Sequence, residues 1–115
     1  MIRTMLKSKI SSAKITDSNL FYEGSIGIDL DILEQSNIKP NEQVQIVNLN
    51  NGERLITYAI KAPRGSKSFV LNGPAARKGL VGDEIMIISY CLVEDAVIDD
   101  HQPIIINLNA DAKNT

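Results

Sequence analysis

The feature that most constrains the fold is a succession of short β-rich segments separated by turn residues. The clearest case is a hairpin. Val44, Ile46 and Leu49 lead into the turn Asn50-Asn51-Gly52, and the run from Leu55 to Ile60 forms the returning strand. An Asn-Gly turn between two runs with apolar alternation is a strong hairpin signal, because Gly tolerates the positive φ of a tight turn. A chain with this texture is expected to be mainly β.

Other segments fit the same texture. Further strands are predicted where apolar and β-branched residues cluster, at residues 1–16, 69–71, 84–93 and 104–106. Two short helices are predicted, from Asp29 to Ser36 with Asp29 or Asp31 as cap and from Gly73 to Gly79 with Pro74 in its first turn. Turn chemistry is predicted at Asp17-Ser18-Asn19 and Pro63-Arg64-Gly65-Ser66, and a frayed end at residues 110–115. Many short strands with two short helices favour a small β barrel.

Composition limits the size and chemistry of the core. The chain has 115 residues, which predicts one domain over residues 1–115. Apolar residues make up 43% of it, enough for a core, but aromatic residues make up 4%, so aliphatic packing must fill that core. The formal net charge of −2 gives no broad attraction to nucleic acid or to an anionic membrane, so neither is an expected partner.

Targeting signals and metal-binding clusters are not evident in the sequence. No apolar run approaches the roughly 18 residues of a membrane helix, and the start lacks a secretory h-region, so a cytoplasmic location is expected. The single cysteine, Cys91, rules out an intramolecular disulfide and is expected to be a buried, inert thiol. The single histidine, His101, is expected in a solvated loop and leaves no His/Cys cluster, so no metal site is predicted.

One dipeptide, Gly24-Ser25, contains two groups that could react with each other. A serine hydroxyl can attack the carbonyl that precedes it, and Gly on the acyl side removes the Cβ that would crowd this attack. Taken alone, however, a Gly-Ser pair is far more often an ordinary turn. The dipeptide gains meaning only from the motifs around it.

Those motifs are spread over residues 1–90 in one order and spacing. They are Met1-Ile2-Arg3-Thr4-Met5-Leu6 with Lys9, Tyr22-Glu23-Gly24-Ser25, Ile28-Asp29, Asn51-Gly52-Glu53-Arg54, Thr57-Tyr58-Ala59-Ile60, Arg64-Gly65-Ser66, Asn72-Gly73-Pro74-Ala75-Ala76-Arg77 and Val81-Gly82-Asp83. Together they resemble the pyruvoyl-dependent aspartate 1-decarboxylase family. Each block is weak alone, and the combination is specific. Ser11 stands where some members have histidine, so no role is assigned to it.

The resemblance implies that the chain is made as a proenzyme and cleaves itself between Gly24 and Ser25. An N→O acyl shift and β-elimination would yield a β chain, residues 1–24, and an α chain, residues 25–115, whose first residue becomes a pyruvoyl group. Thr57 matches the residue that stabilises the oxyanion on Gly24. Some enteric members use an accessory maturation factor, and the sequence leaves open whether this chain does.

The resemblance further implies a lyase that decarboxylates L-aspartate to β-alanine and CO₂. The substrate amine would form a Schiff base with the pyruvoyl carbonyl, which replaces pyridoxal phosphate, and no metal is required. The β-alanine would feed pantothenate and coenzyme A biosynthesis. The family has a double-psi β-barrel fold and forms homotetramers, with sites built between subunits. The fold class expected here is therefore a small double-psi β barrel with two or more short helices.

The resemblance assigns roles to individual residues. Ser25 is the source of the pyruvoyl group, and Tyr58 matches the proton donor to the decarboxylated carbon. The substrate-binding positions implied are Lys9, Arg54, Thr57, Asn72, Gly73, Pro74 and Ala75. Arg54 and Lys9 suit a substrate with two carboxylates. Pro74 has no N–H, so in this loop the backbone of Gly73 and Ala75 would donate.

Two points stay open at the level of sequence. In a regular strand Arg54 and Tyr58 share one face and Thr57 lies on the other, so a bulge or a subunit boundary is expected if both Thr57 and Tyr58 serve one site. Without the resemblance, Arg54 and Lys9 would be interpreted as solvated charges and Tyr58 as a half-buried strand aromatic. The alternative function is therefore a non-catalytic small barrel that serves in binding or regulation.

Overall fold

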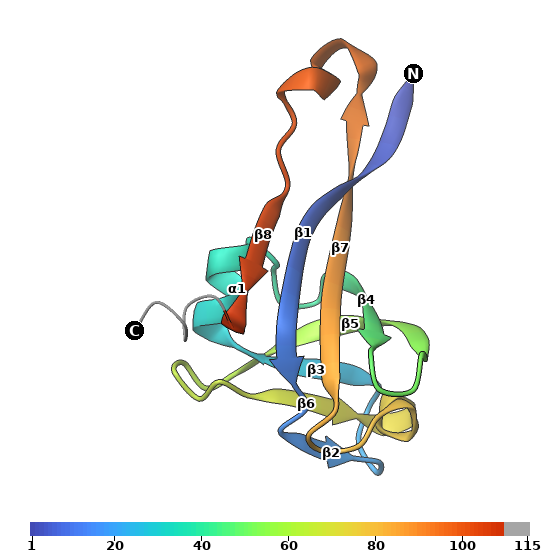
Figure 1. Cartoon of the computed structure of the whole chain (residues 1–115), viewed down its shortest axis with the longest axis vertical. Coiled ribbons are helices and arrows are strands. Elements are labelled where there is room, and N and C mark those ends of the chain that lie inside the picture. Colours follow the sequence, from blue (N-terminus) through green and yellow to red (C-terminus); the bar gives the residue numbers. More distant parts are fainter. Residues whose placement is uncertain (110–115) are drawn as a thin grey trace.

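The computed structural model describes residues 1–109 and is dominated by strands (Figure 1). Between residues 2 and 107, eight strands are connected by three short helices, one α-helical and two of 3₁₀ type. The elements in chain order are β1 (Ile2–Lys14), β2 (Asp17–Asn19), β3 (Ser25–Asp29), α1 (Leu30–Ser36), β4 (Gln43–Asn48), β5 (Arg54–Ala62), β6 (Phe69–Asn72), η1 (Gly73–Lys78), β7 (Glu84–Glu94), η2 (Asp95–Asp100) and β8 (Ile104–Asn107). The predicted mainly β class with two or more short helices is confirmed.

The strands pair in the order β2-β6-β3-β5-β4-β7-β1-β8. The predicted hairpin is present as β4 and β5, which pair antiparallel from Gln43↔Tyr58 to Val47↔Arg54 without a shift of register. β3 and β5 pair in parallel, starting at Ile26↔Ala59, and β3 pairs antiparallel with β6 on its other side. β3 therefore lies between β5 and β6 in the sheet, although both of them follow it in the chain.

The longest pair of strands, β1 and β7, extends beyond the barrel (Figure 1). Their antiparallel register shifts twice, between Leu6 and Ser8 and between Ile10 and Ala13. The second shift coincides with Ser12, which has a φ of 62°, a conformation typical of a bulge that bends its strand. The far end of this pair carries exposed apolar side chains, including Ile2 and Leu92.

The core is aliphatic, as the composition predicts. Phe69 is its one aromatic member among residues 1–109, at the start of β6. The fully buried large apolar side chains come from five of the eight strands, from α1 and from two loops: Ile10, Ile15, Ile26, Ile28, Leu33, Ile38, Val44, Ile46, Leu71, Ile85 and Ile87. Full burial of one such side chain contributes about 1.5–3 kcal/mol relative to exposure, so these branched residues supply the main driving force for closure of the barrel.

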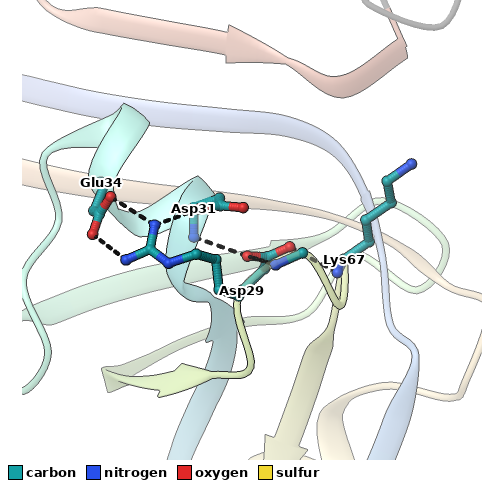
Figure 2. Close-up of polar contacts among 6 residues, drawn as sticks. Asp29, Asp31, Glu34 and Lys67 are labelled. Atoms are coloured by element: carbon teal, nitrogen blue, oxygen red, sulfur yellow. Dashed lines mark hydrogen bonds and ion pairs between the residues drawn. The ribbon is translucent and has the colours of Figure 1, made fainter.

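The junction between β3 and α1 is organised by the carboxylate of Asp29, which is 2% exposed (Figure 2). It caps α1 by accepting a hydrogen bond from the backbone N–H of Asp31 at 2.8 Å. It also accepts from the N–H groups of Gly65 at 3.0 Å and Lys67 at 2.8 Å, in the loop between β5 and β6. Of the two predicted cap candidates, Asp29 and Asp31, the cap is Asp29, and its role as the anchor of this distant loop is not predicted from the sequence.

The pKa of Asp29 reflects these contacts. Burial acts to raise it, but the three backbone donors and the nearby Arg64 guanidinium outweigh burial and hold the pKa below its ordinary value. Arg64 itself pairs with Asp31 and with Glu34 of α1, so the loop and the helix are also linked at the surface (Figure 2). Asp29, the last residue of β3, is therefore held both by α1 and by the loop between β5 and β6.

Some local expectations are wrong. Asp17–Asn19 is predicted as a turn but forms β2, because it pairs in parallel with residues 70–72 of β6. Cys91 is half-buried rather than buried. His101 is half-buried as well, with its Nε2 2.7 Å from the Leu6 carbonyl oxygen. The predicted frayed end at residues 110–115 lies outside the described residues. Within residues 1–109, no helix is long and apolar enough to cross a membrane.

Candidate active site around Gly24-Ser25

Ser25 is the first residue of β3, and its side chain is held by the last residue of β6. Ser25 is 1% exposed and Asn72 is 5% exposed, and the two are register partners in the antiparallel β3–β6 pair. The Asn72 side-chain amide donates a hydrogen bond from Nδ2 to Ser25 Oγ over 3.0 Å. A buried hydroxyl with a fixed partner has a defined direction, which a nucleophile aimed at its own preceding carbonyl requires.

Tyr58 and Thr57 of β5 flank the dipeptide on the other side. Ile26 pairs with Ala59 in the parallel register. Counting back one residue sets Tyr58 level with Ser25, and counting back two sets Thr57 level with Gly24. Paired residues project to the same face of a sheet, so Tyr58 shares the face of the Ser25 side chain. Thr57 projects to the opposite face of β5, two residues before the Ala59 that pairs with Ile26.

Of the two alternatives, a bulge or a subunit boundary, β5 shows no bulge between Arg54 and Tyr58. The register from Arg54 to Tyr58 against β4 runs without a shift, so Arg54 and Tyr58 do share one face while Thr57 lies on the other. Exposure follows this alternation: Arg54 is exposed at the start of the strand, and Ile56 between it and Tyr58 is 65% exposed. Arg54 thus stands on the Tyr58 face, open to a bound molecule.

Lys9 lies farther away within this chain. It sits on β1 and pairs with Ile88 of β7, which in turn pairs with Gln45 of β4, and Gln45 with Ile56 of β5. Three strand spacings separate Lys9 from Ile56, which is about 14 Å along the sheet. The structure therefore groups Ser25, Asn72 and the β5 residues, and leaves Lys9 apart from them.

Two other cationic side chains, those of Lys7 and Arg64, form ion pairs with carboxylates of the protein. Lys7, two residues before Lys9, pairs with Glu42 at 2.8 Å, and Arg64 pairs with Asp31 and Glu34. Burial acts to raise the pKa of Glu42, but Lys7 and the backbone N–H of residue 39 reverse that effect and lower it. In the part of the chain that the structure describes, no ion pair involves Lys9 or Arg54.

The segment Gly73-Pro74-Ala75 opens η1 directly beside the dipeptide. Gly73 and Ala75 are buried and Pro74 is exposed. Gly73 has a φ of 64°, and its Cα faces the backbone of Tyr22 to Gly24. The structure thus brings the predicted loop together with the predicted cleavage site.

Residues 1–109 contain no group of three or more His, Cys, Asp or Glu side chains arranged to hold a metal ion. A pyruvoyl group generated from Ser25 would lose Oγ and carry its ketone oxygen on Cα, and the Asn72 amide, which donates to Oγ here, is a hydrogen-bond donor beside that position.

Comparison with known proteins identifies the family. A model of the aspartate decarboxylase family matches residues 1–115. This chain belongs to the aspartate decarboxylase family. Curated family members with similar sequences are named aspartate 1-decarboxylase. That of Halalkalibacterium halodurans is 54% identical over 95% of this chain and 86% of its own length. That of Coxiella burnetii is 54% identical over 94% and 96%, and that of Maricaulis maris 50% identical over 92% and 88%.

A solved structure supports the fold independently of these family members. The crystal structure of a rationally designed double-psi β-barrel protein, mkDPBB_sym_86, superposes with a TM-score of 0.50. The match covers 67% of this chain and 90% of the designed one, at 13% sequence identity. At that identity the likeness concerns the fold alone, and it confirms the predicted double-psi β barrel.

Proposed function

We propose that this protein decarboxylates L-aspartate to β-alanine and CO₂, and so supplies β-alanine for pantothenate and coenzyme A biosynthesis. The observation that carries the proposal is the match of the whole chain to the aspartate decarboxylase family. The buried Ser25, with its Oγ held by Asn72, adds a local reason, because it stands at the one position where the family resemblance requires a nucleophile.

The proposed maturation is self-cleavage of the 1–115 chain at Gly24-Ser25. Ser25 Oγ attacks the Gly24 carbonyl, the C–N bond breaks, and the proton of the hydroxyl passes to the freed amine, which leaves an ester. β-Elimination then releases residues 1–24 with a free carboxylate and leaves dehydroalanine at position 25, and hydrolysis of the dehydroalanine releases ammonia and leaves a chain of residues 25–115 that begins with a pyruvoyl group. Thr57, level with Gly24 in the β3–β5 register, is the proposed donor to the oxyanion.

The pyruvoyl group supplies a carbonyl that binds the substrate amine and accepts the electron pair released as CO₂ leaves. The rest of the chemistry belongs to side chains of this chain. Tyr58, on the face of Ser25, is the proposed proton donor to the substrate carbon. Arg54 holds a substrate carboxylate with its bidentate fork. Asn72 orients the carbonyl at position 25, and backbone N–H groups at Gly73 and Ala75 complete the binding loop around Pro74.

The proposed assembly is a homotetramer with sites at subunit boundaries. Exposed apolar side chains on the outward face of the long strands support it, among them Leu92 at 73%, Ile56 at 65% and Tyr90 at 50% exposure. The position of Lys9, three strands from β5, also supports it, because Lys9 would reach a substrate held by Arg54 most directly from a neighbouring subunit. A cytoplasmic location and help from a maturation factor stay predictions.

The experiment is a coupled assay of processing and turnover. Purified protein is incubated, checked for cleavage, and then supplied with L-aspartate and no pyridoxal phosphate. Release of CO₂ and β-alanine is expected, and borohydride added with aspartate should attach substrate to the 25–115 chain. A fully cleaved protein that neither releases CO₂ nor traps aspartate would favour the non-catalytic barrel instead.

A further inference from the structure

Three consecutive residues at the β6–η1 junction contact the scissile dipeptide. Asn72 donates to Ser25 Oγ over 3.0 Å. Gly73 faces the backbone of residues 22–24, and Pro74 Cδ lies 3.7 Å from the place where a side chain on Gly24 would begin. The junction therefore surrounds the nucleophile and the bond that it attacks.

Gly73 makes the closest approach. A Cβ on Gly73 would lie 2.8 Å from the amide nitrogen of Gly24 and 3.0 Å from the carbonyl carbon of Glu23, and it would also overlap the carbonyl oxygen of Tyr22. All three atoms belong to the backbone, so no flexible side chain can turn aside to make room. Other glycines with positive φ have open space at this position: Gly52, Gly65 and Gly82.

We propose that Gly73 is a positioning residue for self-cleavage, and that its lack of a side chain sets the placement of the Gly24 carbonyl relative to Ser25 Oγ. This inference rests on the proposed self-cleavage. The N→O shift forms one C–O bond and breaks one C–N bond at the Gly24 carbonyl carbon, so Ser25 Oγ must be held over the face of that carbonyl. A displacement of about 1 Å in such an arrangement can cost about 100-fold in rate.

A backbone role of this kind differs from the binding role that the family resemblance gives to the same loop. Substrate binding uses the N–H of Gly73 and concerns the mature protein. Positioning uses the bare Cα and concerns the precursor, in which residues 22–24 are still joined to Ser25. Substitution of Gly73 should therefore affect cleavage before any substrate is present.

The test compares Ala and Asn substitutions at Gly73 and at Gly52. Gly52 is a matched control because its φ of 76° is close to the 64° of Gly73, while nothing lies within 4 Å of the Cβ position. Asn tolerates a positive φ better than Ala but carries the same Cβ. Thermal melting is recorded for each variant, and cleavage at Gly24-Ser25 is followed by mass spectrometry in the folded fraction isolated by gel filtration.

Cleavage in Gly73→Ala and Gly73→Asn is expected to slow by about 100-fold to a similar extent, because both introduce the same contact. Cleavage in Gly52→Ala and Gly52→Asn should match the wild type, with the Asn variant melting higher than the Ala variant. Hydroxylamine at neutral pH, which cleaves esters far faster than peptide bonds, should release the 1–24 segment from maturing wild type but none beyond the slow rate from Gly73→Ala, since the block precedes the ester.

Several outcomes would overturn the inference. Wild-type rates in Gly73→Ala would remove the positioning role while leaving the proposed function intact. Recovery of cleavage in Gly73→Asn would assign the effect to φ alone. A Gly73→Ala chain that does not fold would show a general structural role rather than local positioning. If the wild type itself never cleaves, the proposed function fails and this role fails with it.

Discussion

The two ends of β3 are both buried and polar, but they are held in different ways. At one end, Asp29 accepts hydrogen bonds from three backbone N–H groups, in α1 and in the loop between β5 and β6. At the other end, Ser25 receives one hydrogen bond, from the Asn72 side chain, and follows a segment packed tightly against Gly73. The first arrangement satisfies a charge, and the second fixes the hydroxyl of the proposed nucleophile.

The comparison predicts that residues important for stability and residues important for the reaction lie at opposite ends of β3. Three donors around a buried carboxylate join elements that are far apart in sequence, so Asp29 is expected to matter for folding. Ser25 and its neighbours form fewer contacts but have the arrangement that a reaction needs. Substitutions at the Asp29 end should therefore lower stability, and those at the Ser25 end should lower activity.

The largest effect is expected for Ser25→Ala. Without the hydroxyl, the chain should remain uncleaved and produce no CO₂ from aspartate above background. The loss of one hydrogen bond from Asn72 should lower the free energy of unfolding by about 1 kcal/mol, so the variant should still fold. Measurement of CO₂ release tests the predicted loss of activity, and thermal melting tests whether the variant still folds. A cleaved Ser25→Ala chain would show that the nucleophile lies elsewhere.

Tyr58→Phe should separate turnover from maturation at this same end. The ring and its packing remain, but the proposed proton donor is lost, so turnover should fall by about 10²–10⁴-fold while cleavage proceeds. Thr57→Val, on the opposite face of β5, is the contrasting variant. It should slow the cleavage step, which precedes turnover. Both are read by mass spectrometry and by β-alanine production. Wild-type turnover in Tyr58→Phe would make Tyr58 a packing residue.

At the other end, Asp29→Ala should destabilise the fold without changing the chemistry. It removes the cap of α1 and leaves three backbone donors without their carboxylate, which should lower the free energy of unfolding by about 2–3 kcal/mol. Urea unfolding in a Ser25→Ala background, at one protein concentration, measures this without interference from cleavage. Asp29→Asn, which keeps one acceptor oxygen, should lose less. Equal stability of all three chains would contradict the anchoring role.

The smallest effect is a pH dependence from the same carboxylate. The pKa of Asp29 is held below its ordinary value of 3.8 by its backbone donors, against the opposing effect of burial. The stabilisation is therefore complete above pH 3.8 and is lost as the pH falls through the lower, folded-state pKa. Melting temperatures between pH 6 and pH 3 should fall more steeply for the wild type than for Asp29→Asn. Parallel curves would assign acid sensitivity to other carboxylates.

Local sequence signals predict most of the elements, because hairpins and caps depend on near neighbours. The Asn50-Asn51-Gly52 turn and the acidic cap at Asp29 both appear where expected. Asp17–Asn19 is not predicted as a strand, since its turn-forming residues become β2 only through pairing with β6. η2, at Asp95–Asp100, is likewise absent from the predictions.

The candidate site is predictable in part. The motifs around Gly24-Ser25, Tyr58 and Asn72 indicate which residues belong to it, but not how they meet. The Ser25–Asn72 hydrogen bond and the level placement of Thr57 with Gly24 depend on strand register between segments far apart in the chain. The close packing of Gly73 also requires coordinates, because the sequence shows a glycine but not what lies beside it.

The central claim is that Ser25 cleaves its own chain at Gly24-Ser25 and becomes a pyruvoyl group. Intact mass spectrometry tests this claim most directly. Purified wild type should resolve under denaturing conditions into residues 1–24 and residues 25–115, with the larger chain bearing the mass of a pyruvoyl group in place of serine. Ser25→Ala, handled in parallel, should give one chain of residues 1–115. A wild-type chain that stays at full length under every maturation condition would contradict the account.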